Sequence, residues 1–125
     1  MTEDSLHRSK KRDAILDLLK STDTHPTAEW IHYVLKNEIP GLGIATVYRN
    51  LKLFEKQGLI QRIDVGDGYD HYDADISQHY HFHCTKCRKV IDLDIPKLEL
   101  DSSLPQGFSA EKHQLVFFGK CKSCN

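Results

Sequence analysis

The sequence has no long apolar run, which argues against a membrane-spanning protein, and it has little excess charge of either sign. None of the hydrophobic stretches in its 125 residues approaches the roughly 20 residues that a membrane-spanning helix needs. The formal net charge is -1 with 28% charged residues, and no signal peptide, internal repeat or low-complexity segment is evident. We therefore expect a soluble, cytoplasmic protein that makes no membrane contact and forms one ordinary domain or two small ones.

The small net charge hides an uneven distribution along the chain. Residues 1–62 hold ten Lys and Arg against eight Asp and Glu, whereas residues 63–125 hold seven against ten. A mildly basic first half before an acidic second half is compatible with nucleic acid at one end and cations at the other, although many soluble proteins share such a pattern.

The first half of the chain shows helical periodicity in three segments. A first apolar stripe covers residues 15–19. After a break at residues 25–26, Thr27 is a suitable N-cap for a second helix that continues to about Asn37. A third helix begins near residue 44, and Gly58 is its expected C-terminal stop. The apolar side chains that we expect to face inward are Ile15, Leu18, Leu19, Ile31, Val34, Leu35, Ile44, Val47, Leu51 and Phe54.

Two extended segments, residues 59–65 and 69–72, follow the third helix and are joined by Gly66-Asp67-Gly68, a strong hairpin signal. Three short helices before a hairpin predict a winged helix-turn-helix, whose third helix can enter the major groove of DNA. An ordinary solvated helix face is the alternative, since charged residues decorate such faces by default. The side chains expected on the DNA-facing side are Thr46, Tyr48, Arg49, Asn50, Lys52 and Lys56, with the basic cluster Arg8, Lys10, Lys11 and Arg12 before the first stripe.

The last third of the chain contains all four cysteines, as two Cys-x-x-Cys pairs. Cys84 and Cys87 form the first pair, and Cys121 and Cys124 the second. Four thiolates in two such pairs form a tetrahedral all-sulfur cage, which zinc prefers. Two local disulfides or a redox dithiol are the alternatives, but no signal peptide and no βαβ pattern accompany the motif. We therefore predict a structural zinc that links the two cysteine pairs and stabilises this part of the chain.

This zinc would stabilise a small sheet that we expect over residues 79–84, 89–95 and 108–119, with a short helical piece near residues 96–100. A sheet of about fifty residues buries little core alone and usually needs a metal or a partner chain, so a homodimer is also expected.

A second metal site is predicted where His79, His81 and His83 alternate along a strand and share one face. Two imidazoles at this spacing form a common chelate, and histidine with carboxylate oxygens suits Fe(II) or Mn(II). Solvated histidines on an exposed strand are the alternative. The acidic candidates to complete the site are Asp70, Asp73, Asp75, Asp92 and Asp94.

Taken together, the motifs make the chain resemble the ferric uptake regulator (Fur) family of metal-dependent repressors over nearly its full length. The residues that carry the resemblance are His25-Pro-Thr-Ala, Ala45-Thr-Val-Tyr-Arg-Asn-Leu, Tyr72-Asp73, His79-Tyr-His81-x-x-Cys84-x-x-Cys87, Val90-Ile91-Asp92 and Gly119-x-Cys121-x-x-Cys124. The resemblance implies an α+β protein: an N-terminal winged-helix DNA-binding domain, residues 1–72, and a small α/β dimerisation domain with the four-cysteine zinc, residues 73–125. It also implies a homodimer that binds a double-stranded DNA operator.

Within the family, the chain is most similar to the peroxide-responsive (PerR) branch. That resemblance implies a regulatory Fe(II) or Mn(II) held by three histidines and two aspartates, which map onto His25, Asp73, His79, His81 and Asp92. In the iron-sensing branch the two aspartate positions are typically Glu. The resemblance further implies that His25 and His79 are the residues that peroxide oxidises when iron is bound, after which the repressor releases DNA.

Several positions depart from the family pattern. Arg49 matches iron-sensing relatives, whereas many peroxide sensors carry Asn there. Relatives usually have an additional helix before the first one predicted here, so DNA affinity is expected to depend on the basic cluster. A third metal site of some relatives is predicted to be absent: Glu99 and His113 supply half of it, and Gln78 and Tyr80 occupy its other two positions. His83 is interpreted as either exposed or packed behind the metal ligands.

Two other functions explain less of the sequence. A metal hydrolase would use the histidine and aspartate site, but five protein ligands leave little room for substrate, and no Ser, Cys or Glu stands out as nucleophile or base. A zinc-ribbon module that binds protein or RNA explains the cysteines but leaves the helix-turn-helix and His25 without a role. An iron-status repressor of the same family remains the main alternative to a peroxide sensor.

Overall fold

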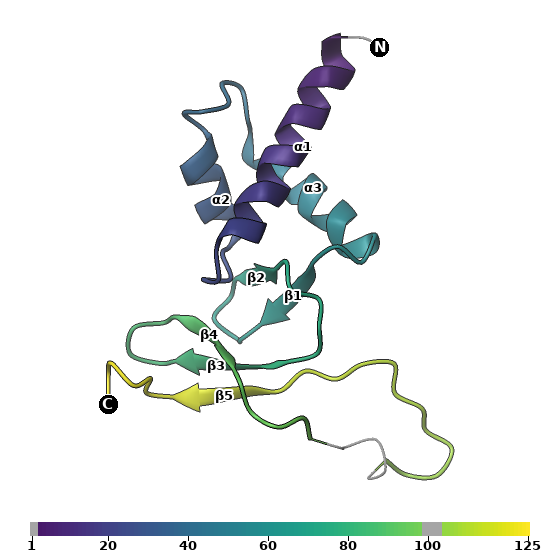
Figure 1. Ribbon diagram of the computed structural model, residues 1–125, viewed down its shortest axis with the longest axis vertical. Coiled ribbons are helices and arrows are strands. Elements are labelled where there is room, and N and C mark those ends of the chain that lie inside the picture. Colours follow the sequence, from purple (N-terminus) through teal and green to yellow (C-terminus); the bar gives the residue numbers. More distant parts are fainter. Residues whose placement is uncertain (1–2, 99–103) are drawn as a thin grey trace. The chain divides into compact units, whose positions relative to one another are not determined.

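The computed structural model describes residues 3–98 and 104–125, and within these ranges the side chains from residue 10 onward. The chain divides into two compact units, residues 1–77 and 78–125. The first contains helices α1 (Glu3–Ser21), α2 (Ala28–Leu35) and α3 (Ile44–Lys56) and strands β1 (Gln61–Asp64) and β2 (Asp70–Asp73); the second contains β3 (Tyr80–Cys84), β4 (Val90–Leu93) and β5 (Val116–Gly119) (Figure 1). Among the described residues, no helix combines the length and the apolar character needed to cross a membrane.

The core of the first unit lies where the three helices contact one another. Val47, Leu51 and Phe54 of α3 are buried as predicted, and so are the apolar stripes of α1 and α2, with Leu18 and Val34 half-buried at their edges. The prediction was wrong for Ile44, which is 38% exposed. It is the first residue of α3, and apolar periodicity does not reveal where a helix extends beyond its packing partners.

The ends of α2 and α3 follow the local signals in the sequence. Thr27 caps α2, and its Oγ1 accepts a hydrogen bond from the Trp30 N–H at 3.2 Å. Beyond α3, Gly58 adopts a positive φ of 74°, which lets the Leu59 N–H turn back to the Phe54 carbonyl at 2.9 Å.

The predicted hairpin is confirmed as the antiparallel pair β1–β2, in which Arg62 pairs with Tyr72. Its turn is stabilised by aspartate side chains: Asp64 accepts the Gly66 N–H at 2.8 Å, and Asp67 accepts the Tyr69 N–H at 3.0 Å. Three helices followed by this hairpin form the winged helix-turn-helix pattern.

The second unit is a three-stranded sheet of order β4-β3-β5. β3 pairs antiparallel with β4 and parallel with β5, so it is the central strand. The predicted third strand is shorter than expected, because residues 108–115 are irregular. β3 begins at Tyr80, and the residues before Leu115 therefore have no neighbouring strand to pair with.

The short helical piece predicted near residues 96–100 is wrong for residues 96–98, and residues 99 and 100 lie outside the described part of the chain. The Leu98 N–H instead donates to the Tyr80 hydroxyl at 2.8 Å. A single turn containing Pro96 is too short to form without tertiary support, and the backbone of residues 96–98 is irregular.

Candidate metal centres and nucleic-acid interface

The four cysteines come together at one end of the sheet in the second unit. Their sulfur atoms all lie within 4.8 Å of one another, and none of the four is in a disulfide. The sulfurs of Cys87 and Cys121 are 3.8 Å apart. A tetrahedral zinc with zinc–sulfur bonds of about 2.3 Å separates its ligands by about 3.8 Å, so this spacing fits a four-cysteine zinc site and not a disulfide.

Backbone geometry prepares Cys84 to be a ligand. The N–H groups of Cys87 and Cys121 donate to its sulfur at 3.3 and 3.4 Å. These hydrogen bonds, that of Cys87 first, lower the pKa of the Cys84 thiol to about 5 and favour the thiolate that binds metal. The pKa of Cys124 is raised to about 12, mainly by its hydrogen bond with the Cys121 side chain. Four crowded sulfurs resist full ionisation unless a cation neutralises them, which is the electrostatic demand that zinc meets.

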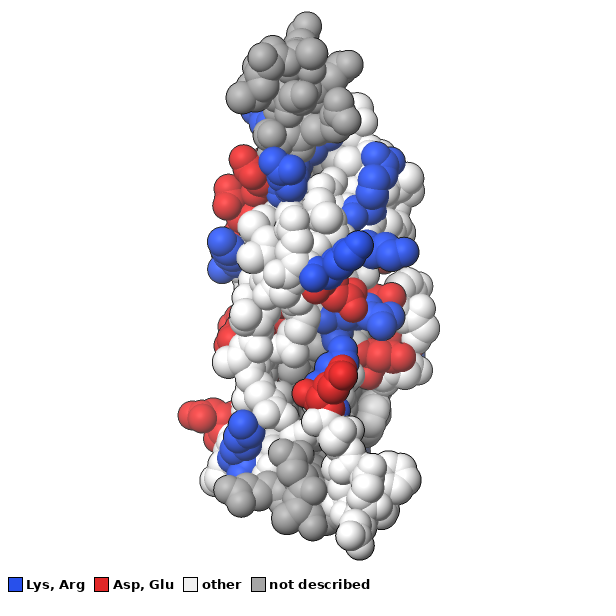
Figure 2. Space-filling model, turned by 90° about the vertical axis from the view of Figure 1, so that its right-hand side faces the viewer, with Lys and Arg blue, Asp and Glu red and all other residues white. Residues whose placement is uncertain are grey.

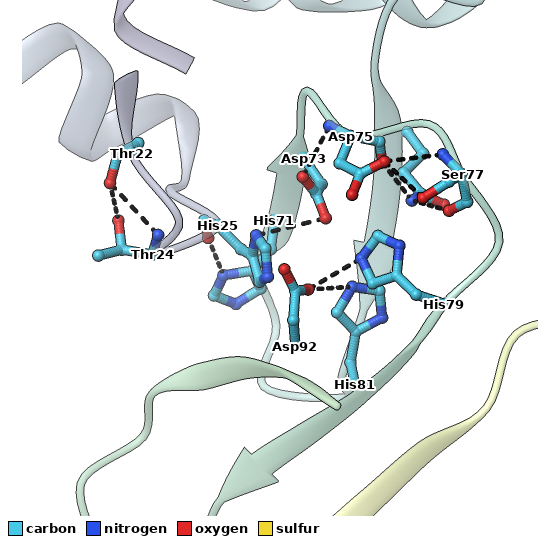
Figure 3. Close-up of polar contacts among 11 residues, drawn as sticks. Thr22, Thr24, His25, His71, Asp73, Asp75, Ser77, His79, His81 and Asp92 are labelled. Atoms are coloured by element: carbon cyan, nitrogen blue, oxygen red, sulfur yellow. Dashed lines mark hydrogen bonds and ion pairs between the residues drawn. The ribbon is translucent and has the colours of Figure 1, made fainter. Parts of the chain in front are cut away.

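A histidine and aspartate cluster lies on the sheet of the second unit, close to the cysteines in sequence. His81 on β3 is opposite Asp92 on β4. Asp92 Oδ1 lies 3.2 Å from His81 Nε2 and 2.8 Å from His79 Nε2 (Figure 3). Antiparallel pairing places opposite residues on the same face, and His79, two residues before His81, lies on that face as well. Two imidazole nitrogens and a carboxylate oxygen thus converge as they do around a divalent cation.

A second pair of possible ligands lies in the first unit. His25 Nδ1 is 3.6 Å from Asp73 Oδ2, and both side chains are almost completely buried (Figure 3). Asp73 is the last residue of β2, and its Oδ1 accepts the Asp75 N–H at 2.9 Å. His25 lies in the segment between α1 and α2 with a positive φ of 52°. This pair offers one nitrogen and one oxygen donor, the same chemistry as the cluster on the sheet.

His71 is a functional candidate that the sequence analysis missed. Its ring Nδ1 is 2.9 Å from the His25 carbonyl oxygen, and its Nε2 is 2.8 Å from Asp67 Oδ2. The available signal was the two-residue spacing between His71 and Asp73 on one strand, which places both side chains on the same face.

His83 is buried, and its ring meets the ring of Phe118 edge-on with centroids 5.9 Å apart. Of the two interpretations offered for His83, exposure is therefore wrong.

The third metal site that is predicted to be absent remains a prediction. Glu99 lies outside the described residues. The amide nitrogen of Gln78 lies 3.0 Å from His113 Nε2, and the Tyr80 and His113 rings are 6.1 Å apart.

The predicted DNA-reading side chains of α3 fall into two groups. Arg49, Lys52 and Lys56 are exposed, whereas Tyr48 and Asn50 make contacts within the first unit. The Tyr48 hydroxyl donates to Glu29 of α2, and this bond raises the pKa of Tyr48 to about 12. The amide of Asn50 donates to the Thr46 carbonyl at 2.9 Å, and both of these residues are half-buried.

In α1, Lys10 and Arg12 are exposed and Lys11 is half-buried, while the Arg8 side chain lies outside the described part. On the face drawn in Figure 2, which is the side of Figure 1 where α3 lies, Lys and Arg side chains gather in the upper half. Clustered basic side chains suit a phosphate backbone, although acidic side chains lie beside some of them on this face.

The comparisons with known proteins agree with the two metal clusters and the helical unit. The model of the ferric uptake regulator family matches residues 3–118. The chain is 34% identical over 128 residues to the peroxide operon regulator of Bacillus subtilis (strain 168), covering 100% of this chain and 88% of that protein. It is 35% identical over 117 residues to the peroxide-responsive repressor PerR of Staphylococcus aureus (strain USA300), covering 91% and 79%.

Among solved structures, the chain is similar to an iron-containing ferric uptake regulator from Francisella tularensis. The TM-score is 0.74 with 32% sequence identity, over 90% of this chain and 89% of that one. The family match spans well over half of the chain, and two relatives exceed 30% identity over most of their length. The chain therefore belongs to the ferric uptake regulator family and is a metal-dependent transcriptional regulator, not an enzyme.

Proposed function

We propose that the protein is a peroxide-responsive repressor that binds operator DNA as a metal-loaded homodimer. The observation that carries this proposal is the donor chemistry: His25 and Asp73 in the first unit, and His79, His81 and Asp92 in the second, supply nitrogen and oxygen only. Such donors suit Fe(II) or Mn(II), whereas the four cysteines suit zinc. Each set alone has few donors, so we infer that one ion takes its ligands from both units.

Metal gating follows from this shared ligand set. An ion held by both units restricts how they are oriented, and it stabilises whichever arrangement it binds more tightly. We infer that this arrangement matches the spacing of the two α3 helices in the dimer to an operator. Exposed Phe117 and Phe118 on β5 support a dimer through the second unit, because large apolar side chains on a small sheet favour coverage by a second copy. A cytoplasmic location remains our expectation for such a DNA-binding regulator.

The peroxide response is proposed from the ligands and from the relatives. The named functions of the Bacillus subtilis and Staphylococcus aureus proteins concern peroxide. Bound iron would supply the one-electron chemistry that activates peroxide next to its ligands. In the overall change one peroxide oxygen replaces a carbon-bound hydrogen of the His25 or His79 imidazole, and the other leaves as water. The oxidised ring is a weaker donor, so metal affinity and then DNA affinity fall.

An iron-status repressor is the second candidate. One observation favours it, the 32% identity to the Francisella tularensis ferric uptake regulator. The family resemblance adds Arg49, a residue that it associates with iron-sensing relatives. Against it, both carboxylates of the proposed site are Asp and not Glu.

The deciding experiment compares iron-loaded and manganese-loaded protein after mild peroxide treatment. Peptide mass spectrometry should find a single-oxygen adduct on the His25 or His79 peptide with iron and none with manganese, and operator binding in a mobility-shift assay should fall in parallel. The His113 peptide is the internal control, because His113 is outside the proposed ligand set. Oxidation of Cys84 or Cys121 with intact histidines would reject peroxide sensing at this site and favour a thiol or iron sensor.

A further inference from the structure

The backbone of His25 needs support from its surroundings. Its φ of 52° lies in the left-handed region, which is uncommon for a residue with a side chain. The next residue is Pro26, and proline further restricts the residue before it. A strained conformation of this kind persists only where neighbouring groups hold it, and it recurs at functional sites.

Strand β2 supplies that support through two neighbouring hydrogen bonds. The Tyr72 N–H donates to the Pro26 carbonyl at 3.0 Å, and His71 Nδ1 lies 2.9 Å from the His25 carbonyl oxygen. Because a carbonyl oxygen only accepts, Nδ1 of His71 carries the proton of this bond. The first bond is an ordinary backbone contact, whereas the second depends on one buried side chain.

Asp67 orients the His71 ring from the hairpin turn. Its Oδ2 lies 2.8 Å from His71 Nε2, and its Oδ1 accepts the Tyr69 N–H at 3.0 Å. The carboxylate is thus fixed by the turn while it holds the ring. Both His71 and Asp67 are mostly buried, with side chains 11% and 14% exposed, which limits the freedom of this contact.

The same strand therefore holds His25 at two points. His71 contacts its backbone, and two residues later Asp73 lies 3.6 Å from its ring. We propose that His71, oriented by Asp67, is a positioning residue that keeps His25 in the backbone conformation required for binding the regulatory metal. This inference rests on the proposed function, in which His25 is a ligand.

The test measures Mn(II) affinity of the zinc-loaded, full-length protein by titration. In His71→Leu the donor is lost, and the affinity should fall about 10- to 100-fold, as for other groups that orient metal ligands. In His71→Asn the side-chain amide can take the place of Nδ1, and the affinity should recover to near that of the unmodified protein. Asp67→Ala should weaken binding in the same direction as His71→Leu, while Asp67→Asn, which still offers an oxygen acceptor, should be milder.

A readout without manganese separates positioning from loss of fold. The nuclear magnetic resonance shifts of the His25 Cα and carbonyl carbon should change in His71→Leu and stay near their original values in His71→Asn. The zinc content and the thermal midpoint identify any variant that has lost its fold. If His71→Leu is unfolded, the Mn(II) affinity and the His25 shifts of His71→Asn are the measurements that test the proposal. If the Leu and Asn variants bind Mn(II) equally, tightly or weakly, the positioning role is overturned.

His25→Ala distinguishes this failure from failure of the proposed function. Unchanged Mn(II) affinity in His25→Ala would overturn the ligand set itself, and with it the role of His71. Lost affinity in His25→Ala, together with full affinity in a folded His71→Leu, would overturn only the positioning role and leave His71 as a brace for the hairpin.

Discussion

Replacing Cys84 by Ser should remove the zinc and unfold the second unit while leaving the first unit folded. Cys84 is completely buried at the end of the central strand, and its sulfur accepts two backbone N–H groups. A serine hydroxyl is a poor zinc ligand, because it stays protonated where the thiol of Cys84, with its pKa lowered to about 5, is ionised.

The size of the effect follows from how little else holds this unit together. Structural zinc sites contribute about 10–16 kcal/mol of apparent binding free energy, so one of four thiolates accounts for on the order of 3 kcal/mol or more. Among the described residues of the second unit, Tyr80 and Val90 are the other buried apolar side chains. Burying side chains of this size stabilises by about 1.5–3 kcal/mol each, which is too little to order 48 residues without the metal.

The assay follows the two units separately. Trp30 is the only tryptophan and lies on α2, so its fluorescence reports on the first unit. Amide resonances of β3, β4 and β5 report on the second. We expect elemental analysis to find less than one zinc per chain in Cys84→Ser, with dispersed β3–β5 signals lost and the Trp30 transition retained. Ser123→Ala, an exposed change between two ligands, is the matched control. One zinc per chain with unchanged melting would refute the assignment of Cys84.

Three further predictions concern the DNA-binding unit and the regulatory site. Arg49→Ala should reduce the preference for operator DNA by about 1–3 kcal/mol if Arg49 contacts a base, whereas equal losses on specific and non-specific DNA would make Arg49 a phosphate contact. Lys52→Ala should weaken binding to all DNA sequences and reduce the salt dependence of binding. Tyr48→Phe should cost about 0.5–1.5 kcal/mol of unfolding free energy. Because the Glu29 bond raises the pKa of Tyr48 to about 12, this contribution is complete below about pH 10 and is lost as the pH rises through 12, which absorbance titration and urea unfolding can follow. Asp92→Ala should abolish manganese-dependent operator binding while zinc content and dimerisation persist; operator affinity that is insensitive to chelator would exclude metal gating.

Local signals explain which parts of the fold were predictable from the sequence. Thr27, Gly58 and the Gly66–Gly68 turn each act within a few residues of themselves, so their effects can be read without the fold. The four-cysteine site was also predictable, because residue type and the Cys-x-x-Cys spacing alone indicate a zinc site. His81 and His83 lie on β3 as predicted, since a strand alternates its faces, whereas His79 lies one residue before the strand begins.

The features that were missed depend on contacts between distant segments. The residue at which β5 starts to pair is set by where β3 begins, and Leu98 is held by its hydrogen bond to the Tyr80 hydroxyl. His71 is the clearest case: its role depends on the carbonyl of His25, which is 46 residues away in sequence. A periodicity argument identifies a face, but it does not identify which atom of another segment that face meets.

The arrangement of candidate ligands along β3 implies a fixed order of dependence between the two candidate metal centres. This strand carries His81 and, three residues later, Cys84, and both are buried. The Cys84 N–H donates to the Lys89 carbonyl at 3.0 Å, and the Thr85 N–H donates to the Gly119 carbonyl at 2.7 Å, so the cysteine end of β3 is tied to both neighbouring segments. A zinc at that end would therefore maintain the pairing that places His81 opposite Asp92. The reverse dependence is weak, because Asp92 is partly exposed and contributes to neither cysteine pair. Under the proposed function, a regulatory ion would therefore be able to leave the histidine and aspartate site while the cysteine end of the sheet stays folded.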